Sequence, residues 1–175
     1  MNRVAIVNIQ QLLAVILLAV LITSCASTPR SSSQSGSAPH RSSTEAPRGS
    51  DKGLTIAQIA QAMVGVSYRY GGSNPDEGFD CSGLVYYSHL KVGEKIPRVS
   101  YAQLAASENV SMSDLQPGDL LFYRINGSPS HVGIYIGQGQ FVHAPSSGKK
   151  VRVTSMANLY FKPRFIRAGR LYSDN

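Results

Sequence analysis

The sequence has few cysteines, few acidic residues and no long hydrophobic run. Its 175 residues include two cysteines and 10 Asp and Glu against 17 Lys and Arg, so the formal net charge is +7. Two cysteines exclude a disulfide-rich scaffold. The positive charge suits an anionic partner, such as phosphate, a membrane surface or an acidic polymer, without choosing among them. The apolar run Leu12–Ile22 is too short to span a bilayer, which needs roughly 20 residues.

The beginning of the chain instead matches a signal segment. Leu12–Ile22 has the length of a signal-peptide core, and small residues, Thr23 and Ser24, lead to Cys25. This pattern resembles the bacterial lipoprotein signal, which implies that residues 1–24 are removed and that Cys25 is acylated. The alternatives are an ordinary signal peptide or an uncut anchor. By the same resemblance, Ala26 in place of Asp favours the outer membrane, facing the periplasm.

The segment after Cys25 cannot form a core. Residues 26–52 contain no Leu, Ile, Val, Phe or Tyr and are rich in Ser and Pro. Such a composition predicts a flexible tether, with a mean reach of about 30 Å. We therefore expect a signal peptide at 1–24, a lipidated cysteine and tether at 25–52, and one folded domain at 53–175.

Within that domain, the apolar periodicity changes from helical to strand-like along the chain. Helices are expected over 54–65, 81–93 (ended by Gly93) and 99–108 (capped by Ser100), separated by a glycine-rich loop at 67–80. Strands are expected within 115–124, 131–144, 149–155 and 158–171, with a hairpin in the second segment. This order predicts an α+β fold, with N-terminal helices packed on an antiparallel sheet of about five or six strands.

Cys81 stands at the start of the second expected helix, directly after the glycine-rich loop. A helix N-terminus has unpaired N–H groups and a partial positive charge, which stabilise a thiolate and lower its pKa. The same N–H groups can stabilise an oxyanion. If Cys25 carries lipid, Cys81 has no disulfide partner. A nucleophile is therefore predicted here, the alternative being a small buried helix residue.

A nucleophilic cysteine needs a base, usually histidine. His40 lies in the tether, and His89 is two turns along the same helix, about 12 Å from Cys81, where it is a surface or packing residue. His131 and His143 remain, and both belong to the expected hairpin.

The expected hairpin places these two histidines together. A three-residue loop over 137–139 would pair residue 133 with His143 and put His131 on the same face, about 7–8 Å away. A two-residue loop would put the histidines on opposite faces. We predict that His131 faces Cys81 and that His143 orients it. The alternatives are ordinary strand histidines or a zinc site with Cys81, whose spacing matches no compact zinc signature.

Four segments carry a resemblance to a known family. These are YRYGGSNPDEGFDCSGLVYY, IPRVSYAQ, LQPGDLLFY and SHVGIYIGQGQFVHA. In this order they resemble the NlpC-type cell-wall cysteine peptidases, over about residues 54–172. The resemblance implies a papain-like fold, with Cys81 as nucleophile, His131 as general base and His143 as the residue that orients His131.

The resemblance also implies a substrate site. Tyr68, Asp80 and Ser82 match positions that line the family's site and can hold a peptide amine or carbonyl, and Arg98 is a further candidate for a substrate carboxylate. The structural alternative is packing for Tyr68 and N-capping of the helix for Asp80. Residues 73–77 form a variable insertion, to which no family contact can be assigned.

Taken with the expected anchor, the resemblance implies a lipoprotein murein endopeptidase that acts on peptidoglycan stem peptides through an acyl-enzyme. By the same resemblance, the bond that is cut lies either next to D-glutamate and a diamino acid or in the cross-link between D-alanine and the diamino acid. The alternative is a catalytically inactive wall-binding or adaptor lipoprotein; an amidase or acyltransferase shares the same chemistry. A monomer is expected, with no cofactor, metal or nucleic acid.

Overall fold

The computed structural model describes residues 50–125, 127–146 and 149–173. The expected signal peptide, Cys25 and residues 26–49 of the expected tether lie outside this part of the chain. Within it, no helix is both long enough and apolar enough to cross a membrane.

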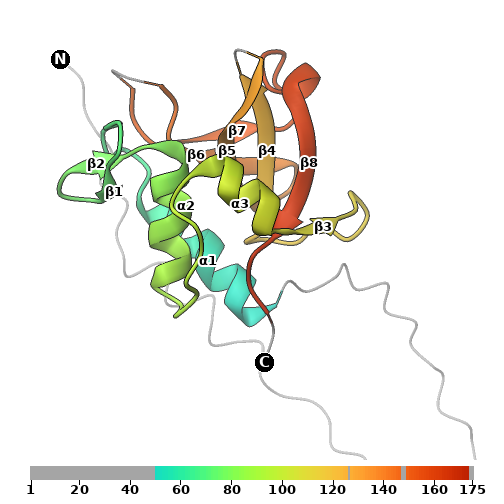
Figure 1. Cartoon of the computed structure of the whole chain (residues 1–175), viewed down its shortest axis with the longest axis horizontal. Coiled ribbons are helices and arrows are strands. Elements are labelled where there is room, and N and C mark those ends of the chain that lie inside the picture. Colours follow the sequence, from blue (N-terminus) through green and yellow to red (C-terminus); the bar gives the residue numbers. More distant parts are fainter. Residues whose placement is uncertain (1–49, 126, 147–148, 174–175) are drawn as a thin grey trace, which may run out of the picture. The chain divides into compact units, whose positions relative to one another are not determined.

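Three helices precede the six-stranded sheet in the chain (Figure 1): α1 (Asp51–Ala62), α2 (Cys81–Leu90) and α3 (Ser100–Ala106). Helix α1 begins earlier than expected, because the Ser50 side chain accepts a hydrogen bond from the Gly53 N–H at 2.9 Å and caps the helix there. The predicted cap of α3 was wrong. The N-cap is Val99, without a side-chain bond, and Ser100 already lies inside the first turn.

The strands form a six-stranded antiparallel sheet in the order β3-β8-β4-β5-β6-β7. They are β3 (Glu108–Val110), β4 (Leu120–Ile125), β5 (Ser128–Gly137), β6 (Gln140–His143), β7 (Arg152–Ser155) and β8 (Phe165–Arg170), with a 3-10 helix at Lys162–Arg164 before β8. A small hairpin, β1 (Ser73–Asn74) and β2 (Gly78–Phe79), lies in the segment expected to be a loop, and β3 begins where the third helix was expected to end. The α+β class and the strand number are confirmed.

Side chains alternate between the two faces of the sheet. On β4, Leu120 and Phe122 pack with helix residues such as Ile56, whereas Leu121 and Tyr123 belong to a second cluster. All of these are almost fully buried, and each contributes roughly 1.5–3 kcal/mol. The helices therefore cover one face of the sheet.

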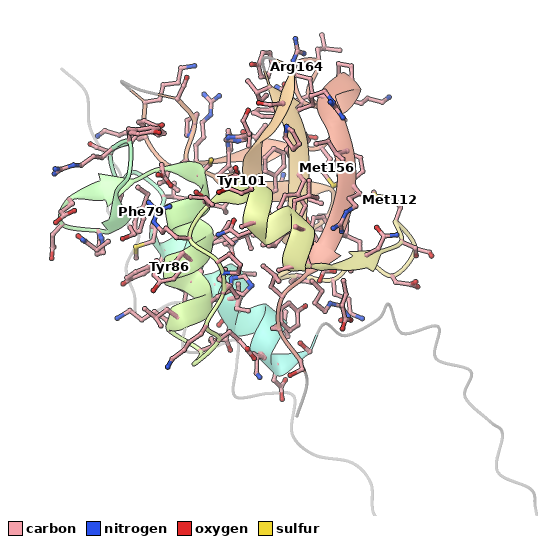
Figure 2. All side chains as sticks on the ribbon, in the orientation of Figure 1. Phe79, Tyr86, Tyr101, Met112, Met156 and Arg164 are labelled. Carbon is pink, nitrogen blue, oxygen red and sulfur yellow. The ribbon has the colours of Figure 1, made fainter. Side chains whose placement is uncertain are left out.

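Phe79 joins the small β1–β2 hairpin to α2 (Figure 2). Its side chain is fully buried, and its ring centroid lies 5.3 Å from that of Tyr87 on α2. This packing places the glycine-rich segment directly before Cys81 against the body of the helix.

The β5–β6 hairpin reaches the predicted register by a different route. Gln138 and Gly139 form a two-residue turn, both with positive φ, instead of the expected three-residue loop. The Cα partners are Ile134 and Val142, Tyr135 and Phe141, and Gly137 and Gln140. Ile136 is an extra residue on β5, and this bulge cancels the shift that the shorter turn would cause. His131 and His143 therefore remain on one face.

His89 is a packing residue and not a surface one. It is fully buried, its Nδ1 lies 2.9 Å from the Val85 carbonyl oxygen, and its Nε2 has no partner within the described residues. Burial lowers the pKa of His89 to about 4. The side chain is thus a neutral part of the core, well away from the cysteine at the other end of α2.

Candidate active site

The start of α2, and with it Cys81, is held by Asp80. The backbone of Asp80 is extended, and its Oδ1 accepts a hydrogen bond from the Gly83 N–H at 2.6 Å. Its Oδ2 accepts another from the Gly71 N–H at 2.9 Å. The capping alternative for Asp80 is therefore confirmed, and one carboxylate joins the glycine-rich segment to the helix.

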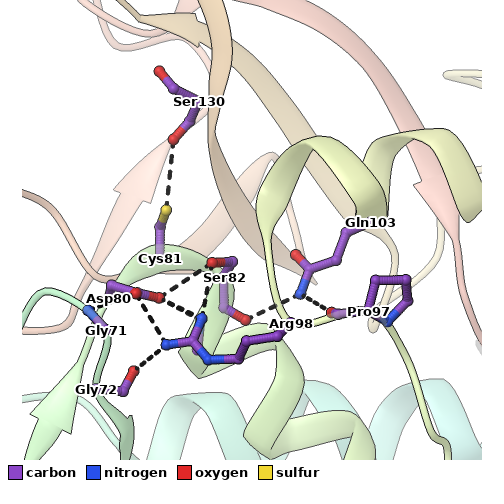
Figure 3. A network of polar contacts seen from close by, with 10 residues as sticks. Gly71, Gly72, Asp80, Cys81, Ser82, Pro97, Arg98, Gln103 and Ser130 are labelled. Carbon is purple, nitrogen blue, oxygen red and sulfur yellow. Dashed lines mark hydrogen bonds and ion pairs between the residues drawn. The ribbon is translucent and has the colours of Figure 1, made fainter.

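Arg98 completes this arrangement (Figure 3). Its guanidinium donates to both carboxylate oxygens of Asp80 at 3.0 Å, to the Gly72 carbonyl at 3.0 Å and to the Ser82 hydroxyl at 3.1 Å. Ser82 in turn donates to Asp80 at 3.2 Å. Such a bidentate pair between an arginine and a carboxylate is stronger and more directional than a single ionic contact. The carboxylate that Arg98 contacts is thus one of the protein's own.

Gln103, on α3, is a further support that the sequence did not indicate. It is fully buried, and its amide nitrogen donates to the carbonyl oxygens of Ser82 at 3.0 Å and Pro97 at 2.9 Å (Figure 3). These two bonds tie the segment that carries Arg98 to the first turn of α2. The residues from Asp80 to Ser82 are therefore bonded to the glycine-rich segment before them and to the segment of Arg98 and Gln103 after α2.

The Cys81 thiol lies against β5. Cys81 is half-buried and unpaired, and its Sγ is 3.7 Å from the carbonyl oxygen of Ser130 (Figure 3). The backbone N–H of Val132 also donates toward the sulfur. Ser130 and Val132 flank His131, where the pairing of β4 with β5 is irregular. The irregularity lies at the point where the thiol meets the strand, and bulges are often found beside functional sites.

His131 and His143 contact each other. The His131 Nε2 is 2.9 Å from the His143 Nδ1, and the His143 Nε2 is 2.9 Å from the Thr154 hydroxyl. The two rings are nearly perpendicular. The structure thus brings together the two histidines that the sequence paired and adds Thr154, on β7, which the sequence did not indicate. Within the described residues, no three His, Cys, Asp or Glu side chains form a metal-binding group.

Phe161 packs against both histidines. Its ring is stacked on His131, with centroids 5.6 Å apart, and meets His143 edge-on at 4.9 Å. Phe161 is buried, and it lies in the segment between β7 and β8. Aromatic contacts of this kind hold the imidazoles in one orientation. No sequence pattern linked Phe161 to the histidines, because the contact depends on the chain returning after β7.

The protonation of the site differs from the expectation that the helix N-terminus lowers the pKa of Cys81. Burial raises the pKa of the Cys81 thiol, and this outweighs the backbone N–H groups of Val132, Ser82 and Cys81 itself, which lower it. Burial lowers the pKa of His131 to about 4. Burial, the charge of His131 and then those of two basic neighbours lower the pKa of His143 to about 2. At neutral pH the free site therefore holds a neutral thiol beside a neutral imidazole.

These shifts predict how Cys81 reacts with iodoacetamide. The alkylation rate should rise with pH and continue to rise above pH 8.5, because the thiolate forms only above the ordinary cysteine pKa. The rate is measured from pH 5 to 10 on residues 43–175, in which Cys81 is the one thiol, with Cys81→Ala as the blank. A rate that is already constant between pH 5 and 7 would contradict the prediction and indicate a preformed thiolate–imidazolium pair.

Known proteins match most of the folded part of the chain. The model of the NlpC/P60 family matches residues 65–170. Murein DD-endopeptidase MepH of Escherichia coli (strain K12) is 38% identical over 114 residues, 62% of this chain and 42% of that protein. Gamma-DL-glutamyl hydrolase of Bacillus subtilis (strain 168) is also 38% identical over 114 residues, 63% of this chain and 27% of that protein. The chain therefore spans less than half the length of these two relatives.

A solved structure agrees with the sequence matches. The crystal structure of an NlpC/P60 family protein from Bacillus cereus ATCC 10987 superposes with a TM-score of 0.65 at 28% identity, over 70% of this chain and 41% of that one. The family match runs from just after α1 to the end of β8, and so includes the thiol, the two histidines and the residues that support them. The chain belongs to the NlpC/P60 family.

Proposed function

We propose that this protein is a peptidase that cuts an amide bond in the peptide part of peptidoglycan, with Cys81 as its nucleophile. The observation that carries the proposal is the position of the Cys81 sulfur, which lies against the backbone on both sides of His131 while the His131 ring is bonded to His143. The name of one relative, a murein endopeptidase, supports the substrate class, and that of another, a glutamyl hydrolase, supports hydrolysis.

In the first half of the reaction, the sulfur attacks the substrate carbonyl carbon while His131 takes the thiol proton. The Nε2 of His131 faces His143, so the proton goes to Nδ1, and the Nε2–H donates to the His143 Nδ1. His143 keeps this tautomer by donating its own Nε2–H to Thr154. The C–N bond then breaks as His131 gives the proton to the leaving amine, and a thioester remains on Cys81.

In the second half, a water molecule attacks the thioester. His131 takes a proton from the water, the C–S bond breaks, and the sulfur recovers its proton as the carboxylic acid leaves. We assign the negative oxygen of both tetrahedral intermediates to the N–H groups of Cys81 and Ser82, which lie near the sulfur at the start of α2. The N–H of Gly83 is already used by Asp80.

The substrate amine or carbonyl would lie along Tyr68, Asp80 and Ser82. Tyr68 is half-buried, and its pKa is raised by burial and by the nearby charges of Cys81 and Asp80. We propose that the Tyr68 hydroxyl makes the direct contact. Asp80 and Ser82 line the same wall, but their polar atoms already have partners within the network around Arg98.

We further propose that the protein is a lipoprotein, with Cys25 as the acylated residue and the segment up to residue 49 as a tether. The support is the apolar run that ends just before Cys25. Such an anchor would hold the peptidase in the cell envelope, at the outer membrane. An intact mass of the membrane-extracted protein equal to residues 25–175 plus acyl chains is expected; an unmodified mass would reject the anchor.

Digestion of purified peptidoglycan tests the peptidase proposal. Residues 43–175 are incubated with peptidoglycan sacculi, and the soluble products are identified by mass spectrometry. New peptide ends are expected, and their position distinguishes cleavage of the D-alanine cross-link from cleavage next to D-glutamate. The absence of new ends from a folded protein that still sediments with the sacculi would favour the alternative, a wall-binding lipoprotein without activity.

A further inference from the structure

A pocket of about 420 Å³ opens beside His131. Its wall includes His131, Lys149, Arg152, Tyr160 and Phe161. None of the residues at the start of α2 lines it, so it is separate from the wall formed by Tyr68 and Asp80. The pocket begins at the imidazole and extends over the segment between β7 and β8.

The position of this pocket relates it to one half of the substrate. In the proposed reaction, the acyl half becomes bonded to Cys81, and the amine half leaves with a proton from His131. The leaving half must therefore lie next to the imidazole when the C–N bond breaks. A pocket that contains His131 but not Cys81 lies on the leaving side.

Two basic side chains line the pocket. Neither Lys149 nor Arg152 has a carboxylate partner among the described residues, and no Asp or Glu is among the residues that form the wall. Arg152 is directly opposite His143 in the pairing of β6 with β7, so the two side chains are on the same face of the sheet. Both cations are close enough to lower the pKa of His143. The positive charge is thus placed beside the reaction centre.

Backbone hydrogen bonds hold the segment that carries these two side chains. The Lys149 carbonyl accepts a hydrogen bond from the Tyr68 N–H at 2.8 Å, and the Val151 N–H donates to the Val66 carbonyl at 2.8 Å. The segment with Lys149 and Arg152 is therefore tied to the strand-like segment that also carries Tyr68. An unpaired cation on a fixed backbone is suited to a charged ligand, because little backbone freedom is lost on binding.

We propose that this pocket binds a carboxylate on the leaving half of the peptide, held by Arg152 and Lys149. The inference rests on the proposed function and adds to it a preference for substrates whose leaving half is acidic. In peptidoglycan stem peptides the carboxylate is either that of the diamino acid side chain or that of the C-terminal residue. Amidation of the recognised group would remove its charge and one of its acceptor oxygens.

Three forms of one synthetic substrate test this inference. The peptide contains the bond that digestion of peptidoglycan identifies, with its leaving-half carboxylates free, with the diamino acid side chain amidated, or with the C-terminus amidated. The wild-type protein should lose roughly tenfold in kcat/KM with one of the two amidated forms, mainly through KM. That form also identifies which carboxylate is bound.

Variants of pocket residues test whether the loss of kcat/KM with the amidated substrate comes from this pocket. Arg152→Gln should lower kcat/KM for the free form by about tenfold and change that for the amidated form by less than twofold. Lys150→Gln is the matched control, since Lys150 is an exposed neighbour with the same charge that does not line the pocket. It should retain the full preference for the free form.

The possible results are distinct. Equal rates with all three forms, or an equal effect of Lys150→Gln and Arg152→Gln, would overturn this inference and leave the peptidase intact. Release of no new peptide ends from sacculi, by a protein that unfolds cooperatively on heating, would overturn the proposed function and this inference together.

Discussion

Replacing Cys81 with alanine is expected to abolish the release of peptides from peptidoglycan, with a fall in rate of at least about 10³-fold. The variant lacks the sulfur, so no thioester forms, and His131 has no proton to take. The rate is measured by mass spectrometry of the released fragments, or with a synthetic stem peptide. Activity that persists in Cys81→Ala would mean that another group is the nucleophile.

The same variant separates catalysis from binding. Cys81 is half-buried, and its sulfur makes only weak hydrogen bonds to the backbone of Ser130 and Val132, so its replacement should change the free energy of unfolding by no more than about 1 kcal/mol. Urea unfolding measures this change. A folded Cys81→Ala protein should still sediment with sacculi. If the wild type and the variant sediment equally and neither cleaves, the wall-binding alternative is favoured.

Replacing Asp80 with alanine should affect both stability and activity. The change leaves the Gly71 and Gly83 N–H groups and the Arg98 guanidinium without their carboxylate, and it removes the cap of α2. We expect a loss of about 2–4 kcal/mol in the free energy of unfolding. Because Cys81 is the next residue, kcat should fall by roughly 100-fold even where the protein is still folded.

Asp76→Ala is the control for this prediction, since Asp76 is an exposed acid in the same glycine-rich segment and its loss changes the net charge equally. Asp80→Asn is an intermediate case, because the amide keeps one acceptor oxygen and loses the ion pair. Urea unfolding and kcat/KM are measured for all three variants. If Asp80→Ala and Asp76→Ala behave alike, Asp80 has no positioning role.

The sequence alone predicted the fold class and named three residues of the candidate site. The change from helical to alternating periodicity predicted helices followed by an antiparallel sheet, and the surroundings of Cys81, His131 and His143 carried the family resemblance. The predicted hairpin placed His131 and His143 on the same face of the sheet, as the structure does, but it assumed a three-residue loop. The turn has two residues, and the bulge at Ile136 restores the register. Local patterns are informative here because strand alternation is a property of neighbouring residues.

The tertiary structure decided how the site is supported and charged. Arg98, Gln103, Thr154 and Phe161 contact the site from segments far along the chain, and no local pattern links them to Cys81 or to the histidines. Burial also reversed the expected shift of the thiol pKa, because the cost of removing the thiolate from water exceeds the stabilisation that the backbone N–H groups give it. The sequence by itself therefore determined which groups are the candidates for the reaction, whereas packing determined their orientation and protonation, since both depend on what surrounds each group in three dimensions.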